Sequence, residues 1–468
     1  MSLLPEASIT TKITACKTKP MKIQASFLVL SLSLAGCFAD APPDAASAAP
    51  VASVPKVFDV RALGAKGDGK TLDTAAIQKA LDACDQAGGG TVRVTAGTYL
   101  SQPLTLRSKT TLLLEAGATL LASPEHKDFM KTPGDWLAAK SSGDFIPLLN
   151  GKDLTDVIIT GKGVIDGNGS VWWAEAEKAR QKVSGYTLPR PNLFTLQRCK
   201  NVKVTGITLR NAPKFHFVPS ECEDLLVDGV TVFAPEHAAN TDGIDPSNCR
   251  NVKITRCIID VGDDNIAIKS GKKLEGREFA CENLTVTDCT FKHGHGMSIG
   301  SEVVGGVRNL VVRNCVFEDT DNGLRIKSRR DPAKGGLVEN ITYEDCVLKN
   351  CHPAISIMSY YQDTTHGKFP RDDQPQPVTA ATPKFRNITI RNITGSSTVT
   401  VGYIVGLPES PVENVLLENL TLSGKEGLTI AHAKGVTLKN VKIMAQTGEP
   451  FTIFNAEVAG LPAAAHQP

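Results

Sequence analysis

Short runs of alternating apolar and polar residues recur along most of the chain, and Gly, Asn or Asp ends most of them. Val202-Lys203-Val204-Thr205 is one such run, and earlier examples are Thr110–Leu114, Val157–Ile159 and Val164–Asp166. This period of two is typical of β-strands, in which successive side chains point to opposite faces of a sheet. No helix-length periodic segment separates the runs, which argues against a barrel of alternating strands and helices.

The runs belong to a repeat. An Asn or Asp followed by an apolar residue recurs at Asn201, Asp224, Asn251, Asn283, Asn309, Asn340, Asn387 and Asn414. The spacing of these positions, from 23 to 47 residues, indicates a solenoid. Short strands and tight corners within one such period indicate a parallel β-helix in which each repeat is one coil. We therefore predict an all-β fold, a single right-handed parallel β-helix over residues 57–460.

The cysteines keep the register of this repeat. Four lie two residues before the marked Asn or Asp (Cys199, Cys222, Cys249, Cys281), and four lie six residues after it (Cys257, Cys289, Cys315, Cys346). Coils stacked about 4.8 Å apart would bring neighbouring cysteines near bonding range, and exported proteins often use disulfides. However, side chains that point in parallel have poor torsional geometry for a bridge, so we predict inward-facing free thiols.

One helix is expected ahead of the repeat. Ile77, Ala80, Leu81 and Cys84 follow helical spacing, Asp73 can cap the helix, and Gly88-Gly89-Gly90 stops it. Such a helix can cover the open N-terminal end of the sheets and protect it against edge pairing. Insertions between coils are predicted to form side loops at residues 124–147, 172–192 and 359–383.

Residues 1–37 are interpreted as a signal sequence. Met21-Lys22 begins a basic stretch and is a candidate true start, and Ile23–Leu34 is an apolar run too short to span a bilayer. The run ends Leu34-Ala35-Gly36-Cys37, which resembles a bacterial lipobox in which Cys37 is lipidated. Ordinary cleavage near Ala39-Asp40-Ala41 is the alternative.

Residues 38–56, rich in Ala and Pro, are predicted to form a tether. Together with the signal sequence they predict an exported protein, either a periplasmic or outer-membrane lipoprotein or a secreted protein. The net charge of the 468 residues is only +2, so no global field recruits nucleic acid or an anionic membrane. Local basic residues must provide any preference for an acidic substrate, and we expect a monomer.

Polar side chains converge when the coils are aligned on their final serines, Ser270, Ser301 and Ser328. The alignment places four side chains in one column: Asp242, Asp264, His295 and Asn322. Asp263 lies beside this column, and Arg325 and Lys327 project from the same sheet two coils further on. Because side chains alternate along a strand, Ile326 between them points into the core.

Clustered carboxylates raise the pKa of at least one member, which suits a general acid near neutral pH. An acid and a base on rigid coils suit glycosidic hydrolysis, and Arg325 and Lys327 can bind the carboxylate of an acidic sugar. Alternatively, Asp and Asn at solenoid corners are turn formers, or the acids hold calcium. His293 and His295 lack the partners of a zinc site.

These residues resemble a known family. The motifs Asn240-Thr241-Asp242, Gly262-Asp263-Asp264, Gly294-His295-Gly296 and Arg325-Ile326-Lys327 occur in the order found in the polygalacturonase family, glycoside hydrolase family 28. The similarity spans roughly residues 57–455, and the segments Phe58–Gly69 and Ile165–Trp173 resemble the bacterial members.

The resemblance implies an inverting hydrolase of α-1,4-galacturonan that uses no cofactor and no metal. It implies that Asp263 is the general acid, that Asp242 and Asp264 activate the water, and that His295 tunes the protonation of the acid. It also implies that Arg325 and Lys327 hold a galacturonate carboxylate, with Asn240 and an aromatic residue in the substrate site. Tyr361 matches the aromatic position best, with Tyr360 as the alternative.

Two competing functions remain at this point. A calcium-dependent pectate lyase shares the fold and the polymer, but it needs calcium and a basic residue that abstracts a proton. A non-catalytic carbohydrate-binding β-helix would show aromatic side chains stacked along one face, and aromatic residues here are only 5% of the chain. Neither the choice between internal and terminal cleavage nor the tolerance of methyl esters follows from the sequence.

Overall fold

The computed structural model describes residues 56–182, 188–362 and 369–462. The compact unit that begins at residue 54 is considered below. The predicted signal sequence with Cys37, and the predicted tether apart from Lys56, lie outside the described residues. Among the described helices, none is long and apolar enough to cross a membrane.

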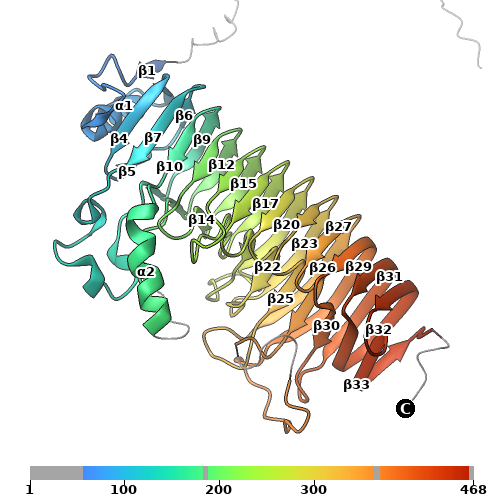
Figure 1. Ribbon diagram of the computed structural model, residues 1–468. Coiled ribbons are helices and arrows are strands. Elements are labelled where there is room, and N and C mark those ends of the chain that lie inside the picture. The colour runs from blue at the N-terminus through green and yellow to red at the C-terminus, as the bar shows by residue number, and fades with distance from the viewer. Residues whose placement is uncertain (1–55, 183–187, 363–368, 463–468) are drawn as a thin grey trace, which may run out of the picture. The chain divides into compact units, whose positions relative to one another are not determined.

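Parallel strands stack along the chain into a coil with three sides (Figure 1). The first side consists of β1 (Val57–Asp59), β3 (Gly90–Val94), β6 (Thr110–Leu114), β9 (Thr155–Gly161), β12 (Lys200–Thr205), β15 (Glu223–Asp228), β17 (Arg250–Thr255), β20 (Cys281–Thr287), β23 (Val307–Arg313), β26 (Leu337–Glu344), β29 (Lys384–Ser397), β31 (Val412–Gly424), β32 (Glu426–Ala445) and β33 (Phe451–Ala459). Each of the last four strands is long enough to continue from one side of the coil onto another.

The other two sides are shorter. The second side consists of β2 (Asp68–Leu72), β4 (Gly97–Ser101), β7 (Ala118–Ala122), β10 (Val164–Asp166), β13 (Thr208–Arg210), β16 (Thr231–Phe233), β18 (Ile258–Val261), β21 (Thr290–His293), β24 (Val316–Glu318) and β27 (Val347–Cys351). The third side consists of β5 (Leu104–Thr105), β8 (Leu149–Lys152), β11 (Phe194–Gln197), β14 (Phe217–Ser220), β19 (Ile266–Ile268), β22 (Met297–Gly300), β25 (Leu324–Lys327), β28 (Ile355–Met358) and β30 (Thr400–Val405).

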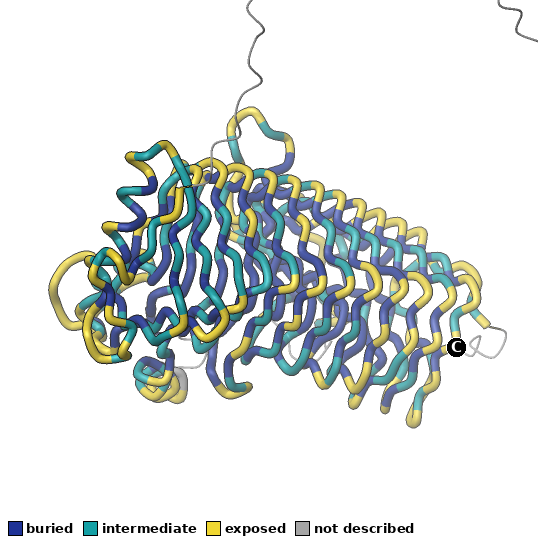
Figure 2. Tube along the Cα trace, turned by 90° about the horizontal axis from the view of Figure 1, so that it is seen from above, coloured by how far each residue is buried: buried dark blue, intermediate teal, exposed yellow. Residues whose placement is uncertain are grey.

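This architecture is the parallel β-helix that the sequence predicts. Every strand pairing is parallel and joins one coil to the next, for example Val202 to Leu225 and then to Val252. Alternate residues of each strand point inward, so the interior is one continuous apolar core (Figure 2). Burial of this core and the coil-to-coil hydrogen bonds make the strands a rigid support for side chains at the corners.

The repeated asparagines form a ladder of side-chain hydrogen bonds. All eight marked positions have positive φ between 54° and 59°, a conformation that Asn and Asp tolerate better than most residues. Each amide Nδ2 donates to the carboxyl or amide oxygen of the preceding coil; Asn309 donates to Asn283, and Asn340 donates to Asn309, both at 3.1 Å. The ladder therefore fixes the register between coils.

The two cysteine columns lie inside the core. All ten cysteines among the described residues are buried free thiols, which confirms the prediction of inward-facing cysteines that do not bridge. Cys222 also illustrates how the thiols are satisfied, because its Sγ donates to the carbonyl oxygen of Ser220 at 3.4 Å.

Helix α1 (Thr74–Gln86) lies against the first coil, as predicted, with Ile77, Ala80, Leu81 and Cys84 buried (Figure 1). The predicted capping role of Asp73 is wrong, because its side chain makes no hydrogen bond to the helix. Its two carboxylate oxygens instead accept the backbone N–H groups of Lys66 and Gly67 at 2.6 and 2.9 Å. The carboxylate thus fastens the preceding turn to the start of the helix.

Two of the predicted side loops contain helical structure that the sequence pattern did not reveal. Residues 172–192 contain most of helix α2 (Ser170–Lys182), and residues 124–147 contain the short 3-10 helices η1 (His126–Phe129), η2 (Trp136–Ala138) and η3 (Ser142–Asp144). The buried face of α2 is provided by Trp172 and Ala176, and alanine contributes little to an apolar pattern. The indole of Trp172 lies within 6.0 Å of the rings of His126, Phe129, Trp136 and Phe145, so the two insertions form one aromatic cluster.

Candidate active site

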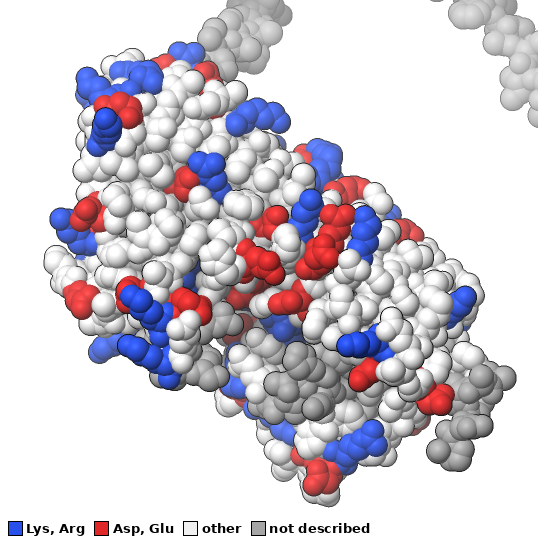
Figure 3. Space-filling model, viewed as in Figure 1, with Lys and Arg blue, Asp and Glu red and all other residues white. Residues whose placement is uncertain are grey.

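The predicted column of polar residues is present at the corner between the second and third sides. Ile244 pairs with Ile266, which in turn pairs with Met297, and Met297 pairs with Leu324. Counting two residues back along each chain segment aligns the four polar residues in the predicted order, namely Asp242, Asp264, His295 and Asn322. Asp263 immediately precedes this column. Figure 3 shows acidic side chains gathered at the middle of this face of the molecule.

Asp264 is a buried carboxylate that two cations hold in place. Lys327 Nζ donates to Oδ2 at 2.6 Å, Arg325 Nη1 donates to Oδ1 at 3.3 Å, and Ser298 Oγ donates to Oδ1 at 2.7 Å. Burial alone would raise the pKa of Asp264, but the charges of Lys327 and Arg325 outweigh burial and leave this pKa lowered. Asp264 is therefore ionised, and Ile326 points into the core between its two cations as predicted.

Asp263 is more accessible and pairs with His295. The imidazole Nδ1 lies 3.1 Å from Asp263 Oδ1, and the Asn240 amide Nδ2 donates to Oδ2 at 3.3 Å. Burial opposes ionisation of this carboxyl, but the positive His295 and the more distant Lys327 lower its pKa. The same pair raises the pKa of His295 to about 9 against the opposing effect of burial, so the imidazole is charged at neutral pH.

Asp242 carries the raised pKa that the clustered acids predict. Burial is the largest cause, and the neighbouring charges of Asp245 and Asp263 raise the pKa further. Lys269 compensates in part, with Nζ 3.3 Å from Asp242 Oδ2 and 2.5 Å from Asp245 Oδ2. In the free protein the pKa of Asp242 is thus raised, whereas that of Asp263 is lowered.

Sequence reasoning missed three charged residues of this region. Lys269 and Asp245 belong to the aligned segments: Lys269 directly follows β19, and Asp245 directly follows Ile244, which pairs with Ile266 of β19. Asp321 precedes Asn322 in the column, and its Oδ2 lies 3.4 Å from His295 Nε2. Extending the alignment to every charged residue beside the column would have found all of them.

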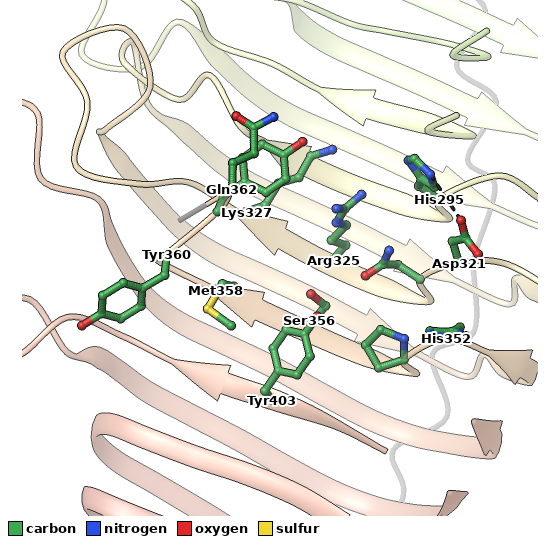
Figure 4. A pocket seen from close by; sticks show the side chains of 13 residues that line it. His295, Asp321, Arg325, Lys327, His352, Ser356, Met358, Tyr360, Gln362 and Tyr403 are labelled. Carbon is green, nitrogen blue, oxygen red and sulfur yellow. Dashed lines mark ion pairs between the residues drawn. The ribbon is translucent and has the colours of Figure 1, made fainter. Parts of the chain in front are cut away.

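A pocket of 490 Å³ opens beside the acids on the C-terminal side (Figure 4). Its lining includes His295, Arg325, Lys327 and Tyr361, which are four of the residues that the sequence singled out. The Tyr361 ring lies 5.6 Å from the Arg325 guanidinium carbon and 5.2 Å from Lys327 Nζ. The pocket combines positive charge with an aromatic face, which suits an acidic sugar.

The alternative aromatic, Tyr360, is less suited to this role. Its ring is buried, and its hydroxyl donates to Asp373 Oδ2 at 2.7 Å, away from the acids. Figure 4 shows its ring directed away from Arg325 and His295. The structure therefore favours Tyr361 of the two.

A second pocket, of 960 Å³, lies on the other side of the acids. Residues of α2, among them Trp173 and Glu177, form one wall, and His237 and Ala239 form the other. Ala239 directly precedes Asn240, whose Nδ2 donates to Asp263 Oδ2, so this pocket includes the residue next to one that contacts the acid. A linear polymer can therefore contact protein on both sides of the acids.

Asp263, Asp264 and His295 offer potential metal ligands, with their oxygen and nitrogen atoms all within 4.8 Å of one another. The group is a poor match for calcium, which takes six to eight oxygen ligands, since one of these atoms is an imidazole nitrogen. Asp264 also has two cationic partners already. The residues present therefore suit proton transfer better than they suit calcium.

Known proteins share both the sequence and the fold. Residues 84–447 match the model of glycosyl hydrolases family 28. An endo-polygalacturonase of Pectobacterium carotovorum subsp. carotovorum is 33% identical over 386 residues, which cover 80% of this chain and 89% of that protein.

Two solved structures are similar along most of the chain. A polygalacturonase from Erwinia carotovora ssp. carotovora has a TM-score of 0.68 and 30% identity, and the match covers 87% of this chain and 97% of that one. A family 28 exopolygalacturonase from Yersinia enterocolitica has a TM-score of 0.71 and 25% identity over 88% of this chain and 79% of that one.

Proposed function

The chain belongs to family 28 of the glycosyl hydrolases, and we propose that it hydrolyses α-1,4 linkages between galacturonosyl residues of pectic homogalacturonan or its oligomers. The observation that carries this proposal is the position of three carboxylates beside a pocket lined by Arg325, Lys327 and Tyr361. The carboxylates supply acid and base for glycosidic cleavage, and the pocket supplies cations for a sugar that bears a carboxylate.

In the proposed mechanism Asp263 protonates the leaving oxygen, and its proton comes from His295. The imidazolium Nδ1 is 3.1 Å from Asp263 Oδ1, so the pair already contains the proton that the acid needs. A galacturonate carboxylate bound by Arg325 and Lys327 brings negative charge close to Asp263. This charge raises the pKa of the acid and favours transfer of the proton from the imidazole.

Protonation of Asp263 also prepares the base. The negative charge of Asp263 is one of the causes that raise the pKa of Asp242. When Asp263 becomes neutral this repulsion disappears, so the pKa of Asp242 falls and a proton that Asp242 carries passes to solvent, which returns one to the neutral His295 after the reaction. Asp242 and the ionised Asp264 then activate a water for direct displacement with inversion. Substrate binding thus exchanges the protonation states of Asp242 and Asp263.

The test is hydrolysis of unesterified polygalacturonate in the presence of EDTA by the wild type, Asp263→Asn and Asp260→Asn. Asp260 is the matched control, because it lies on the same coil but pairs with His293 instead of His295. We expect the wild type and the control to produce reducing ends without ultraviolet absorbance, and Asp263→Asn to lose at least about a hundredfold in rate. Products that absorb in the ultraviolet and require calcium would instead identify a lyase.

Product lengths from the same reactions distinguish internal from terminal cleavage. The names of the similar proteins include both an endo- and an exo-enzyme, so they do not decide the mode for this chain. Random shortening of the polymer identifies an endo-enzyme, whereas a single small product released from the start identifies an exo-enzyme.

We also propose that the chain is an exported monomer, anchored to a membrane through a lipidated Cys37. The support is the short apolar run followed by Leu34-Ala35-Gly36-Cys37. Mass spectrometry of the mature protein checks this, since lipidation predicts Cys37 as an acylated N-terminal residue. An unmodified N-terminus after Cys37 would contradict the anchor, and light scattering tests the monomer.

A further inference from the structure

Arg190 is a buried arginine behind the acid cluster, in the segment between α2 and β11. Its side chain is fully buried and makes three hydrogen bonds. Nε donates to the carbonyl oxygen of Leu188 at 3.2 Å, and Nη1 donates to the carbonyl oxygen of Ala239 at 3.1 Å. Nη2 donates to the side-chain Oδ1 of Asn240 at 2.9 Å. All three acceptors are neutral.

A charge buried without an ion pair is unfavourable, so its retention requires another interaction. Burial lowers the pKa of Arg190 to about 10, which still leaves the guanidinium charged at neutral pH. The charges of Asp263 and Asp242 oppose this lowering. Among the described residues no carboxylate lies within ion-pair distance of Arg190. The cation therefore acts on the acids without contacting them directly.

The contact with Asn240 defines the orientation of that amide. Oxygen and nitrogen of an asparagine amide are hard to distinguish by shape, but an arginine donates only and cannot accept. The oxygen of Asn240 must therefore face Arg190, and its Nδ2 must face Asp263 Oδ2, as the 3.3 Å contact shows. A reversed amide would place two hydrogen-bond donors together on one side and two oxygens together on the other.

We propose that Arg190 is a positioning residue for the hydrolysis proposed above, and that it locks the Asn240 amide so that Nδ2 always donates to the catalytic Asp263. The proposal rests on that function for its kinetic consequences. Asp263 Oδ1 is held by His295 and by the backbone N–H of Asp264 at 2.9 Å, so the Asn240 contact completes the fixation of both oxygens. The carboxyl group then cannot turn away from the bond to be cleaved.

The lock also links two segments of the site. Arg190 joins the chain that follows α2 to the loop that carries Ala239 and Asn240. The same loop lines the second pocket, so the orientation of Asn240 is coupled to the wall that a bound polymer contacts.

Four variants test the proposal: Arg190→Met, Arg190→Lys, Asn240→Ala and the double variant Arg190→Met/Asn240→Ala. Arg190→Met should lower kcat on the order of tenfold to a hundredfold with little change in KM, because the acid loses its fixed geometry. The alkaline limb of the pH–rate profile should move to higher pH, since a donor to the ionised acid and a nearby cation are both lost.

If Arg190 acts through Asn240, the double variant loses no more activity than the single variants. Arg190→Lys retains the charge without the planar fork, so it should restore the position of the pH limb but not the full kcat. Arg198→Met is the control, because Arg198 is an exposed arginine paired with Asp153 and should leave the kinetics unchanged. Multiplicative losses in the double variant, or an unchanged pH profile in Arg190→Met, would overturn the proposal.

A substrate-free measurement separates this proposal from the proposed function. The side-chain amide of Asn240, identified in an NMR spectrum by its absence in Asn240→Ala, should exchange its hydrogens slowly in the wild type. In Arg190→Lys, which preserves charge and volume and guards against misfolding of the methionine variant, exchange should quicken on the order of tenfold. Unchanged exchange would refute the lock even in a protein inactive on galacturonan.

Discussion

The three aspartates of the site have different partners. Asp264 has two cations, Asp263 has the imidazolium of His295, and Asp242 has a lysine shared with another carboxylate. These partners lower the pKa of the first two and leave the third raised. Environment, rather than residue type, assigns the roles.

The pairing of His295 with Asp263 predicts the pH at which its imidazole titrates. Its imidazole should titrate near pH 9 in an NMR titration, because the negative Asp263 stabilises the charged form. In Asp263→Asn that charge is gone, so the midpoint should fall towards the ordinary value of about 6.5. His293, which pairs with Asp260 instead, is the internal control and should not move. An unchanged midpoint for His295 in the variant would show that Asp263 is not its main partner.

The raised pKa values of His295 and Asp242 also make the stability of the folded protein depend on pH. A folded pKa raised above the unfolded one means that the His295 pair contributes fully below about pH 6.5 and that its contribution is lost as pH rises through about 9. The raised pKa of Asp242 acts in the same sense, because folding favours the protonated carboxyl and ionisation at higher pH opposes folding.

Asp242→Asn should therefore stabilise the protein at neutral pH while it removes activity. The substitution keeps the shape of a protonated carboxyl and removes a buried group whose ionised form is unfavourable. We expect an increase in Tm of a few degrees at pH 8 and a smaller one at pH 5, measured by calorimetry. Lower stability than the wild type at both pH values would contradict the raised pKa.

At the scale of elements, the asparagine ladder should contribute measurably to stability. Asn309→Ala removes two ladder hydrogen bonds of 3.1 Å and places alanine at a φ of 56°, so we expect a loss of about 1–3 kcal/mol in the free energy of unfolding. Asn309→Gly loses the same bonds but tolerates that φ, and should recover about 1 kcal/mol of the loss. Urea denaturation of both variants measures the difference, and equal losses would show that φ is unimportant.

Helix α2 should contribute to substrate binding beyond the cleaved bond. Trp173 lines the second pocket, and its Nε1 donates to the carbonyl oxygen of Ala212 at 3.1 Å, which holds the ring in place. Trp173→Ala should raise KM for long oligogalacturonides by about threefold to tenfold and leave the shortest cleavable substrate unaffected. Lys178→Ala, an exposed change on the same helix, is the control. An equal effect on all lengths would place Trp173 outside the binding path.

Elements of this fold differ in how clearly the sequence marks them. The strand at Val164–Asp166 is predicted with its observed bounds, because β-branched alternation and the coil repeat agree there. Helix α2 escapes prediction, since its buried face rests on Trp172 and alanine and is stabilised by contacts with a distant insertion. Arg190 escapes for a related reason, because an arginine in an irregular segment carries no periodic signal.

The column of polar residues is the part of the site that the sequence predicts best. The protonation states of these residues are the part that it predicts least well. Asp242, Asp264 and His295 align through the strand register, which the repeat reveals. Their pKa values depend on Lys269, Asp245 and burial, which only three-dimensional packing determines.

At the scale of the whole molecule, the continuous core should keep every described thiol unreactive. All ten described cysteines are buried, and access to them requires unfolding of a coil. In the variant Cys16→Ser/Cys37→Ser, Ellman's reagent should modify no cysteine of the folded protein and ten after denaturation in guanidinium chloride. Rapid reaction of several thiols in the native protein would show that the coils open readily.

Two corners of the coil carry different kinds of residue. The asparagine ladder lies where each first-side strand begins. The column of Asp242, Asp264 and His295 and the insertions after β7 and β10 all lie where the chain leaves the second side. The insertions can therefore change in sequence and length without disturbing the coil register, which the asparagine ladder fixes at the other corner. Variable loops change on a constant antibody framework in the same way. A lineage of such proteins can acquire new polymer preferences by exchanging these insertions, while the strands keep the acids in place.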